Sequence, residues 1–289
     1  MKQVCHWRKP LKTEKINTDN FHSTALQLFR FIGSALKEEK EVKRIALCAL
    51  SLVYSGVPPK GDLFDMAARY IADRQQKDGG WSDVEETVLS IKTISLLGRG
   101  KFDPSVARGR TWLRHQQNPD GGWGRSSRDI SRIPVTGFLI YLLPDISDSK
   151  AVSWLRDEWR KDLGCNVKLT YKGGFSLLGF SASGVSANDC PLIGETYAYL
   201  HEEQNDDGGF GPWKNHPIGS DPWSTGIVLL GLLSYPELAK RAVIEKTTNW
   251  LTKAQLLNGL WPCHYLEEGS SYAYWGIVES LKYLSKDIS

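Results

Sequence analysis

The sequence has few cysteines, little net charge and no long apolar run, and each shortage excludes a class of protein. Its five cysteines among 289 residues (Cys5, Cys48, Cys165, Cys190, Cys263) are odd in number and lack CxxC spacing, which argues against a disulfide framework and a zinc ribbon. A net charge of +3 gives no polybasic surface for nucleic acid. No apolar run approaches the about 18 residues of a membrane span, and no signal-peptide core follows the basic amino terminus. We therefore expect a soluble, cytoplasmic protein.

The clearest positive feature is a repeated segment. Four copies combine an aromatic-containing helical stretch, a Gln and a Gly-Gly or Gly-Leu pair, and they end at Trp81, Trp123, Phe210 and Trp261. A degenerate copy without the Gln ends at Phe175. Self-similarity at spacings of roughly 35 to 50 residues is typical of repeat folds, in which each unit buries its apolar face only against its neighbours. The repeats therefore predict one continuous core.

Two kinds of helical segment alternate along the repeats. Segments before the glycine pair are amphipathic, as in residues 62–76, and we expect them to form an outer layer. Segments after the pair are apolar nearly all round, which predicts buried inner helices over residues 88–97, 134–143, 175–184, 225–233 and 271–281. Residues 20–36 are assigned as a sixth inner helix and 42–54 as its outer partner. The prediction is an all-α (α/α)6 toroid, one domain over residues 1–289, with an atypical helix pair in 1–57 and repeats in 58–289.

Local signals agree with these boundaries. Ser82 or Asp83 can cap the helix that begins at Val84, and Asp221 stands before a proline at another helix start. The glycine pairs are expected to supply the left-handed backbone of a tight turn between helices. The aromatic residue after each pair is then expected to be structural.

The repeat, aromatic-aliphatic-x3-Gln-x-Gly-x-Trp, is similar to the QW motif of squalene-hopene and oxidosqualene cyclases. Residues 60–285 resemble one barrel of the terpenoid cyclase and prenyltransferase superfamily. The resemblance implies a class II-like terpenoid cyclase that starts cyclisation or isomerisation of a polyprenyl chain by protonation. Squalene-type cyclases enclose their active site between two barrels, whereas this chain has the length of one, so a second subunit could complete the site.

The segment Asp83-Val84-Glu85-Glu86-Thr87 resembles the Asp-x-Asp-Asp-Thr motif, whose middle carboxylic acid protonates an alkene or epoxide in class II cyclases. The matching acid is Glu85, assisted by Asp83 and Glu86, although two aspartates of the motif are glutamates here. Protonation of an alkene needs a carboxyl that stays neutral in a dry cavity until it is used. The alternative is helix capping, because acidic residues in a first turn bind free N–H groups.

Two loops that enter inner helices should lie at the same rim of the ring. One carries Arg125, Arg128, Asp129 and Arg132, and the other carries Lys214, His216 and Asp221. Parallel inner helices aim several amino ends at one opening, so this rim is predicted to attract an anionic head group such as a diphosphate or carboxylate. The alternative is a pair of solvated loops with Arg–Asp ion pairs.

Aromatic residues on the inner helices could stabilise a carbocation, because ring faces attract cations. Trp223, Tyr272 and Trp275 are the substrate-binding candidates, and core packing is the alternative for each.

Two other functions stay open. One is a prenyltransferase-type enzyme that acts on a prenyl diphosphate. Asp221 is the residue that would align with the aspartate of its zinc site, but Pro222 and Trp223 follow and no cysteine is nearby. Cys263 and His264 are adjacent, too close to bind one metal together. The other is a non-catalytic toroid that binds a lipid or a protein. We expect no metal or other cofactor, apart from Mg²⁺ if a diphosphate is ionised. An apolar small molecule is the expected partner, and peripheral membrane contact is compatible with it.

Overall fold

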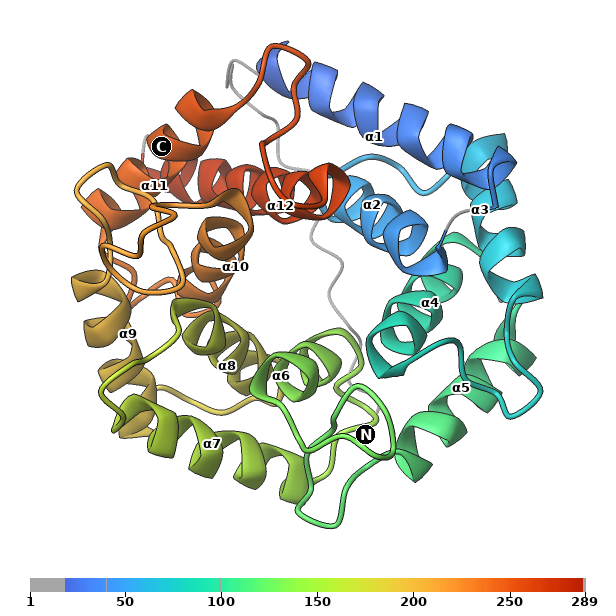
Figure 1. Ribbon diagram of the computed structural model, residues 1–289, viewed down its shortest axis with the longest axis horizontal. Coiled ribbons are helices and arrows are strands. Elements are labelled where there is room, and N and C mark those ends of the chain that lie inside the picture. Colours follow the sequence, from blue (N-terminus) through green and yellow to red (C-terminus); the bar gives the residue numbers. More distant parts are fainter. Residues whose placement is uncertain (1–18, 40, 99, 288–289) are drawn as a thin grey trace.

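The computed structural model describes residues 19–39, 41–98 and 100–287, which form two concentric rings of α-helices (Figure 1). Residues 1–18, with Cys5 and the basic amino-terminal segment, lie outside this description. The predicted all-α (α/α)6 toroid is confirmed. The elements are α1 (Asp19–Lys37), α2 (Val42–Tyr54), α3 (Asp62–Asp73), α4 (Val84–Leu97), α5 (Asp103–His115), α6 (Ile133–Leu142), α7 (Ser149–Leu163), α8 (Thr170–Ala182), α9 (Pro191–Glu202), α10 (Pro222–Leu232), α11 (Arg241–Ala254), α12 (Leu266–Leu284) and a short 3-10 helix, η1 (Ser285–Asp287).

Even-numbered helices form the inner ring and odd-numbered helices the outer ring (Figure 1). Burial explains this division: every residue of α10 except Trp223 is buried, whereas α5 buries only Gly109 and Leu113. A helix that is apolar all round needs neighbours on every side, while an amphipathic helix needs them on one. The inner ring closes where α12 contacts α2. Within the described chain, no helix combines the length and the apolar content of a membrane span.

The first two helices are placed opposite to the prediction. Helix α1 lies in the outer ring and buries a single stripe of side chains at helical spacing, including Phe21, Leu28 and Ile32. Helix α2 lies in the inner ring and buries all residues from 45 to 52. The prediction was wrong because the helix with the continuous buried run, rather than the first helix of the pair, occupies the centre.

The degenerate repeat is also different from the prediction. Gly173 and Gly174 lie inside α8 rather than in a turn, so this inner helix begins at Thr170. A larger residue would not fit at Gly174, because the backbone of the neighbouring helix α10 is close. A β-carbon there would lie 2.9 Å from the Ile227 carbonyl oxygen. Phe175 is therefore a residue of the inner ring.

Each repeat glutamine ties its own turn to the next outer helix. The side-chain amides of the four glutamines donate to the glycine carbonyl four residues later, at 2.7–3.0 Å. The same amides reach the following outer helix or its cap, at Ser105, Asp148, Val243 and Thr24. The last contact joins Gln255 to Thr24 of α1. The glutamine contact that links consecutive outer helices therefore also closes the outer ring.

The glycines and aromatics of the repeats fix the turns. Gly79, Gly121, Gly208 and Gly259 have φ between 86° and 100°, the left-handed backbone expected from the sequence. The indole N–H groups of Trp81, Trp123 and Trp261 donate to the carbonyl ten residues earlier, at 2.7–2.8 Å. The aromatic side chains thus lie buried between the outer helix before the turn and the inner helix after it.

Candidate functional site

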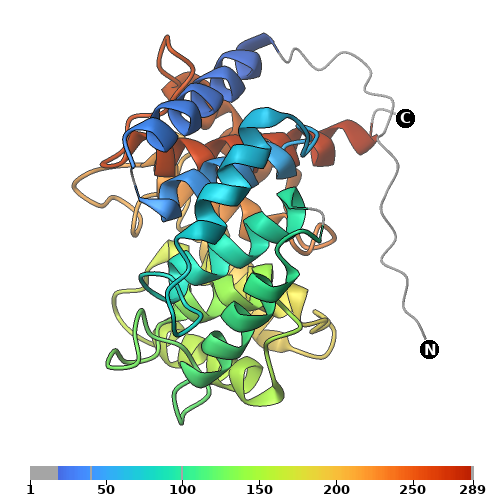
Figure 2. The same cartoon turned by 90° about the vertical axis from the view of Figure 1, so that its right-hand side faces the viewer.

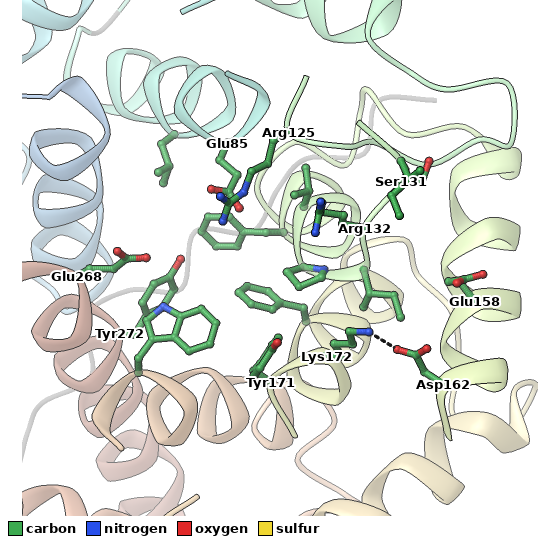
Figure 3. A pocket seen from close by; sticks show the side chains of 18 of the residues that line it. Glu85, Arg125, Ser131, Arg132, Glu158, Asp162, Tyr171, Lys172, Glu268 and Tyr272 are labelled. Atoms are coloured by element: carbon green, nitrogen blue, oxygen red, sulfur yellow. Dashed lines mark hydrogen bonds and ion pairs between the residues drawn. The ribbon is translucent and has the colours of Figure 1, made fainter. Parts of the chain in front are cut away.

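A cavity of about 410 Å³ lies at the end of the ring where the inner helices begin (Figure 3). All six inner helices, or the loops that lead into them, contribute side chains to it. The volume is within the range of about 300–1,000 Å³ that is typical of small-molecule sites. Parallel packing of the inner helices explains why residues from six distant parts of the chain meet there.

Aromatic rings form one wall of the cavity. The lining aromatics are Phe138, Tyr171, Phe175, Trp223 and Tyr272. Ring centroids lie 5.6 Å apart for Phe138 and Phe175, 6.0 Å for Phe138 and Tyr272, and 5.0 Å for Tyr171 and Trp223. The predicted residues Trp223 and Tyr272 therefore share one apolar wall with three further rings.

Trp275 does not line this cavity. Its ring stacks on Tyr54 at 4.5 Å between centroids and lies 5.8 Å from Tyr141. Burial raises the pKa of both tyrosines. Trp275 belongs to a second aromatic cluster in the core, one turn further along α12 than Tyr272.

The three carboxylates of the acidic segment have different surroundings. Asp83 caps α4 by accepting from the Glu86 backbone N–H at 2.7 Å. The buried Glu86 accepts from the backbone N–H groups of Lys43 at 3.1 Å and Ser82 at 3.2 Å. Burial raises the pKa of Asp83, although the hydrogen bond from Glu86 opposes this change. Of the three, only Glu85 lines the cavity.

Glu85 is held by Lys43, a residue that the sequence did not indicate. The Lys43 Nζ lies 2.7 Å from the Glu85 Oε2. Burial lowers the pKa of Lys43, but the Glu85 carboxylate more than offsets it, so the pKa is raised. Lys43 was missed because it lies in the first turn of α2, which the sequence predicted to be in the outer ring.

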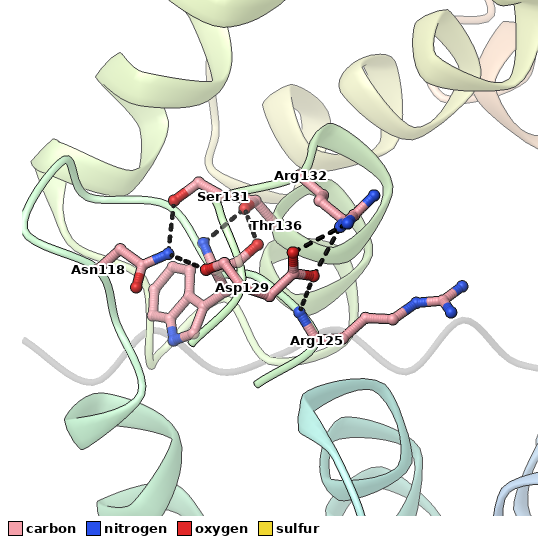
Figure 4. Close-up of polar contacts among 7 residues, drawn as sticks. Asn118, Arg125, Asp129, Ser131, Arg132 and Thr136 are labelled. Atoms are coloured by element: carbon pink, nitrogen blue, oxygen red, sulfur yellow. Dashed lines mark hydrogen bonds and ion pairs between the residues drawn. The ribbon is translucent and has the colours of Figure 1, made fainter. Parts of the chain in front are cut away.

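The loop before α6 brings two of its three arginines to the cavity. Arg125 and Arg132 line it, whereas the exposed Arg128 does not. Arg132 holds Asp129 through two hydrogen bonds of 2.7 and 2.9 Å, and Asp129 also accepts from the Arg125 backbone N–H (Figure 4). These bonds lower the pKa of Asp129 to about 2. The Arg125 guanidinium makes no hydrogen bond or ion pair with any described residue.

The loop before α10 contributes none of its predicted residues to the cavity. The Lys214 ammonium donates to the Glu202 carbonyl at 3.0 Å, and His216 packs edge-on against Trp213. Asp221 caps α10 by accepting from the Ser224 backbone N–H at 2.8 Å, and burial raises its pKa. Of the two predicted loops, only the one before α6 therefore brings its predicted charged side chains to the cavity.

The cavity lining carries four basic and four acidic side chains. The basic ones are Lys43, Arg125, Arg132 and Lys172; the acidic ones are Glu85, Glu158, Asp162 and Glu268. Lys172 and Asp162 form an ion pair of 2.5 Å. Because the charges balance, the cavity lacks the concentrated positive field that a diphosphate needs.

A metal site does not fit these residues. Nowhere in the described ranges do three or more His, Cys, Asp or Glu side chains form a group able to hold a metal ion. The carboxylate of Asp221, the residue that would align with a zinc ligand, is engaged at the amino end of α10.

The sequence is similar to those of known proteins. Residues 86–284 match the family described as the prenyltransferase alpha-alpha toroid domain. Protostadienol synthase A from Arthroderma gypseum is 29% identical in an alignment of 104 positions that covers 33% of this chain and 14% of that protein. The chain thus matches only a small part of that relative's length.

Solved structures share the toroid at low identity. The type II terpene cyclase MstE from Scytonema with merosterolic acid A, its product, has a TM-score of 0.62 and 15% identity, covering 93% of this chain and 99% of that one. Its complex with the substrate geranylgeranyl dihydroxybenzoate has a TM-score of 0.61, 15% identity and coverage of 92% and 98%. A possible member of the GH105 family from Klebsiella pneumoniae has a TM-score of 0.65 and 11% identity, covering 98% and 99%. These likenesses show the fold alone.

Proposed function

The chain belongs to the prenyltransferase alpha-alpha toroid domain family, and on that premise we propose that it is a terpenoid cyclase-like enzyme that cyclises or isomerises a polyprenyl substrate after protonating it. The observation that carries this proposal is the cavity at the amino ends of the inner helices. It combines five aromatic rings with carboxyl groups in one partly enclosed space. Such a combination suits a reaction that begins with an acid and continues through a cation.

The cavity supports each requirement of that reaction. A carboxyl group donates a proton to a terminal alkene, and aromatic faces then stabilise the positive charge by their quadrupoles. The wall of Phe138, Phe175, Trp223 and Tyr272 keeps polar groups away from the chain of the substrate. Exclusion of water from this wall prevents early capture of the cation.

The balanced charges favour a weakly charged head group over a diphosphate. Arg125 is the cavity guanidinium that no described residue binds, and one arginine suits one carboxylate or a hydroxylated ring. The substrate of MstE, geranylgeranyl dihydroxybenzoate, has this chemistry. We propose a polyprenyl chain that carries a single acidic or phenolic head group.

Incubation with three probes tests this function. The probes are geranylgeranyl dihydroxybenzoate, geranylgeranyl diphosphate and squalene, and the products are analysed by mass spectrometry. An isomer of equal mass with fewer double bonds is the expected product of the first probe. Release of diphosphate from the second would instead support a prenyltransferase-type enzyme. Saturable binding of a probe without turnover would support the non-catalytic toroid.

Exposed apolar side chains gather at the end of the ring where the inner helices begin. In the described residues, eight of the ten exposed large hydrophobic side chains lie in the loops that enter the inner helices or at the start of α12. Figure 2 shows that these loops project on one side of the ring. They are Ile130, Val167, Trp213, Ile218, Leu256, Leu257, Tyr265 and Leu266. Because exposed basic residues such as Arg128 and Lys214 lie among them, we propose that this face rests on an anionic membrane surface from which an apolar substrate can enter.

Substitution of Leu257 by Asp should weaken binding to vesicles of phosphatidylserine and phosphatidylcholine by about tenfold or more, because a fully exposed leucine would be lost from the contact. Cosedimentation measures the partition. Met66→Asp is the control, because Met66 is also an exposed apolar residue, with 54% of its surface accessible, but lies on the outer helix α3. Equal binding of the two variants would contradict a membrane contact through the loops that enter the inner helices.

A further inference from the structure

Three of the four carboxyl groups that line the cavity are paired with lysines. The ammonium of Lys43 lies 2.7 Å from Glu85, that of Lys172 lies 2.5 Å from Asp162, and that of Lys161 lies 3.1 Å from Glu158. The fourth, Glu268, makes no side-chain hydrogen bond or ion pair with any residue that the structure describes. The cavity thus contains one carboxyl with a distinct environment.

Pairing decides which carboxyl can carry a transferable proton. A carboxylate that accepts from a lysine ammonium is stabilised in its ionised form, and its protonation requires the loss of that ion pair. Protonation of Glu85 would require the loss of its ion pair with Lys43. The carboxylates of Asp83 and Glu86 accept hydrogen bonds from backbone N–H groups. We infer that Glu268, rather than Glu85, is the proton donor of the proposed cyclisation, an inference that rests on the proposed function.

The position of Glu268 suits this role. It lies in the first turn of α12, and Figure 3 shows its carboxyl directed into the cavity beside Tyr272. Tyr272 follows four residues later on the same face of the helix, 6.0 Å from Phe138 and 6.3 Å from Trp223 between ring centroids. A cation formed at Glu268 would therefore arise next to the aromatic wall.

Charged and ionisable groups from several elements lie near Glu268. The ionisable groups near Glu268 are Lys43 from α2, Cys263 from the preceding loop and Tyr272 from α12. Lys43 is bound to Glu85, so its charge acts on Glu268 only from a distance.

The proposed step is balanced without an oxidant or reductant. The O–H bond of Glu268 breaks as the π pair of the terminal alkene forms a C–H bond. The π pair of the next alkene then forms a C–C bond to the cation. Loss of a proton from a neighbouring carbon to the Glu268 carboxylate restores the acid and leaves an isomer of the substrate.

Glu268→Gln tests this inference with geranylgeranyl dihydroxybenzoate as the probe. We expect the rate of isomer formation to fall by about 10² to 10⁴-fold, the usual contribution of a general acid, with an unchanged melting temperature. Glu268→Asp should recover part of the activity, which a purely structural role would not predict. In D₂O the wild-type product should contain one added deuterium on a carbon. Glu267→Gln is the control, because Glu267 binds Arg44 and does not line the cavity.

The outcomes separate this inference from the proposed function. Full loss of activity in Glu85→Gln, together with retention in Glu268→Gln, would overturn the assignment of Glu268 and leave a cyclase that uses the acid of the sequence motif. A wild-type chain that converts no probe would overturn the proposed function and the inference with it. Loss of folding in Glu268→Gln is detected by the melting temperature, and the Glu268→Asp variant then decides the assignment.

Discussion

Replacement of Trp123 by alanine should lower the free energy of unfolding by about 3–5 kcal/mol, which is a large part of the stability of a typical domain. The Trp123 side chain is fully buried, and its indole N–H donates to the Leu113 carbonyl at 2.8 Å. Truncation would leave a cavity between the outer helix α5 and the inner helix α6. Urea denaturation monitored by circular dichroism measures the change.

The repeats supply the control for this experiment. Phe210 occupies the position of Trp123 in another repeat, and the Phe210 backbone N–H donates to Thr225 as that of Trp123 donates to Thr136. Trp123→Phe should therefore cost only about 1–2 kcal/mol, chiefly from the Leu113 carbonyl that loses its partner. Equal costs for alanine and phenylalanine would show that the indole hydrogen bond, rather than the buried ring, provides the stability.

Replacement of Gly226 by alanine should destabilise the inner ring and disturb the cavity together. A β-carbon at Gly226 of α10 would lie 2.6 Å from the carbonyl carbon and 2.7 Å from the carbonyl oxygen of Tyr272. Backbone cannot move aside as a flexible side chain can, so α10 and α12 must separate at a cost of about 1–3 kcal/mol. Thermal unfolding measures the stability. The affinity for geranylgeranyl dihydroxybenzoate should also fall, because Tyr272 lines the cavity.

Gly194 is the matched position for this substitution. It lies in the outer helix α9, and a β-carbon there would meet no atom within 4 Å. Gly194→Ala should be neutral or stabilising by up to about 1 kcal/mol, because alanine favours the helix. A loss of stability at Gly194 as large as that at Gly226 would contradict helix separation as the cause.

The ring could be predicted from the sequence because the sequence features that determine it are local. The turn glycines, the repeat glutamines and the difference between amphipathic and wholly apolar helices each act over a few residues. The reversed order of α1 and α2 and the mistaken turn at Gly173 have different causes. The helix with the continuous buried run, α2, occupies the inner ring although it follows α1 in the chain. Glycine pairs were interpreted as turns, whereas Gly173 and Gly174 allow close helix packing, which depends on neighbours far away in the sequence.

The site was harder to predict because its contacts join distant segments. The position of the acidic segment at the amino end of α4 could be predicted from its spacing, but the ion pair between Lys43 and Glu85 depends on the packing of α2 beside α4. The environment of Glu268 depends on what the other three carboxyl groups bind. Similarly, no local pattern indicates that Lys214 binds the end of α9 instead of facing the cavity.

Closure of the outer ring through Gln255 and Thr24 has a consequence for biosynthesis. These two residues are separated by 231 positions, so the contact cannot form until most of the polypeptide has left the ribosome. Until then α1 has neighbours on one flank only, and the nascent chain is an open arc with an uncovered edge. Completion of the circle is therefore expected to be a late and slow event, which makes translation of the last repeat the step at which the protein is most exposed to aggregation.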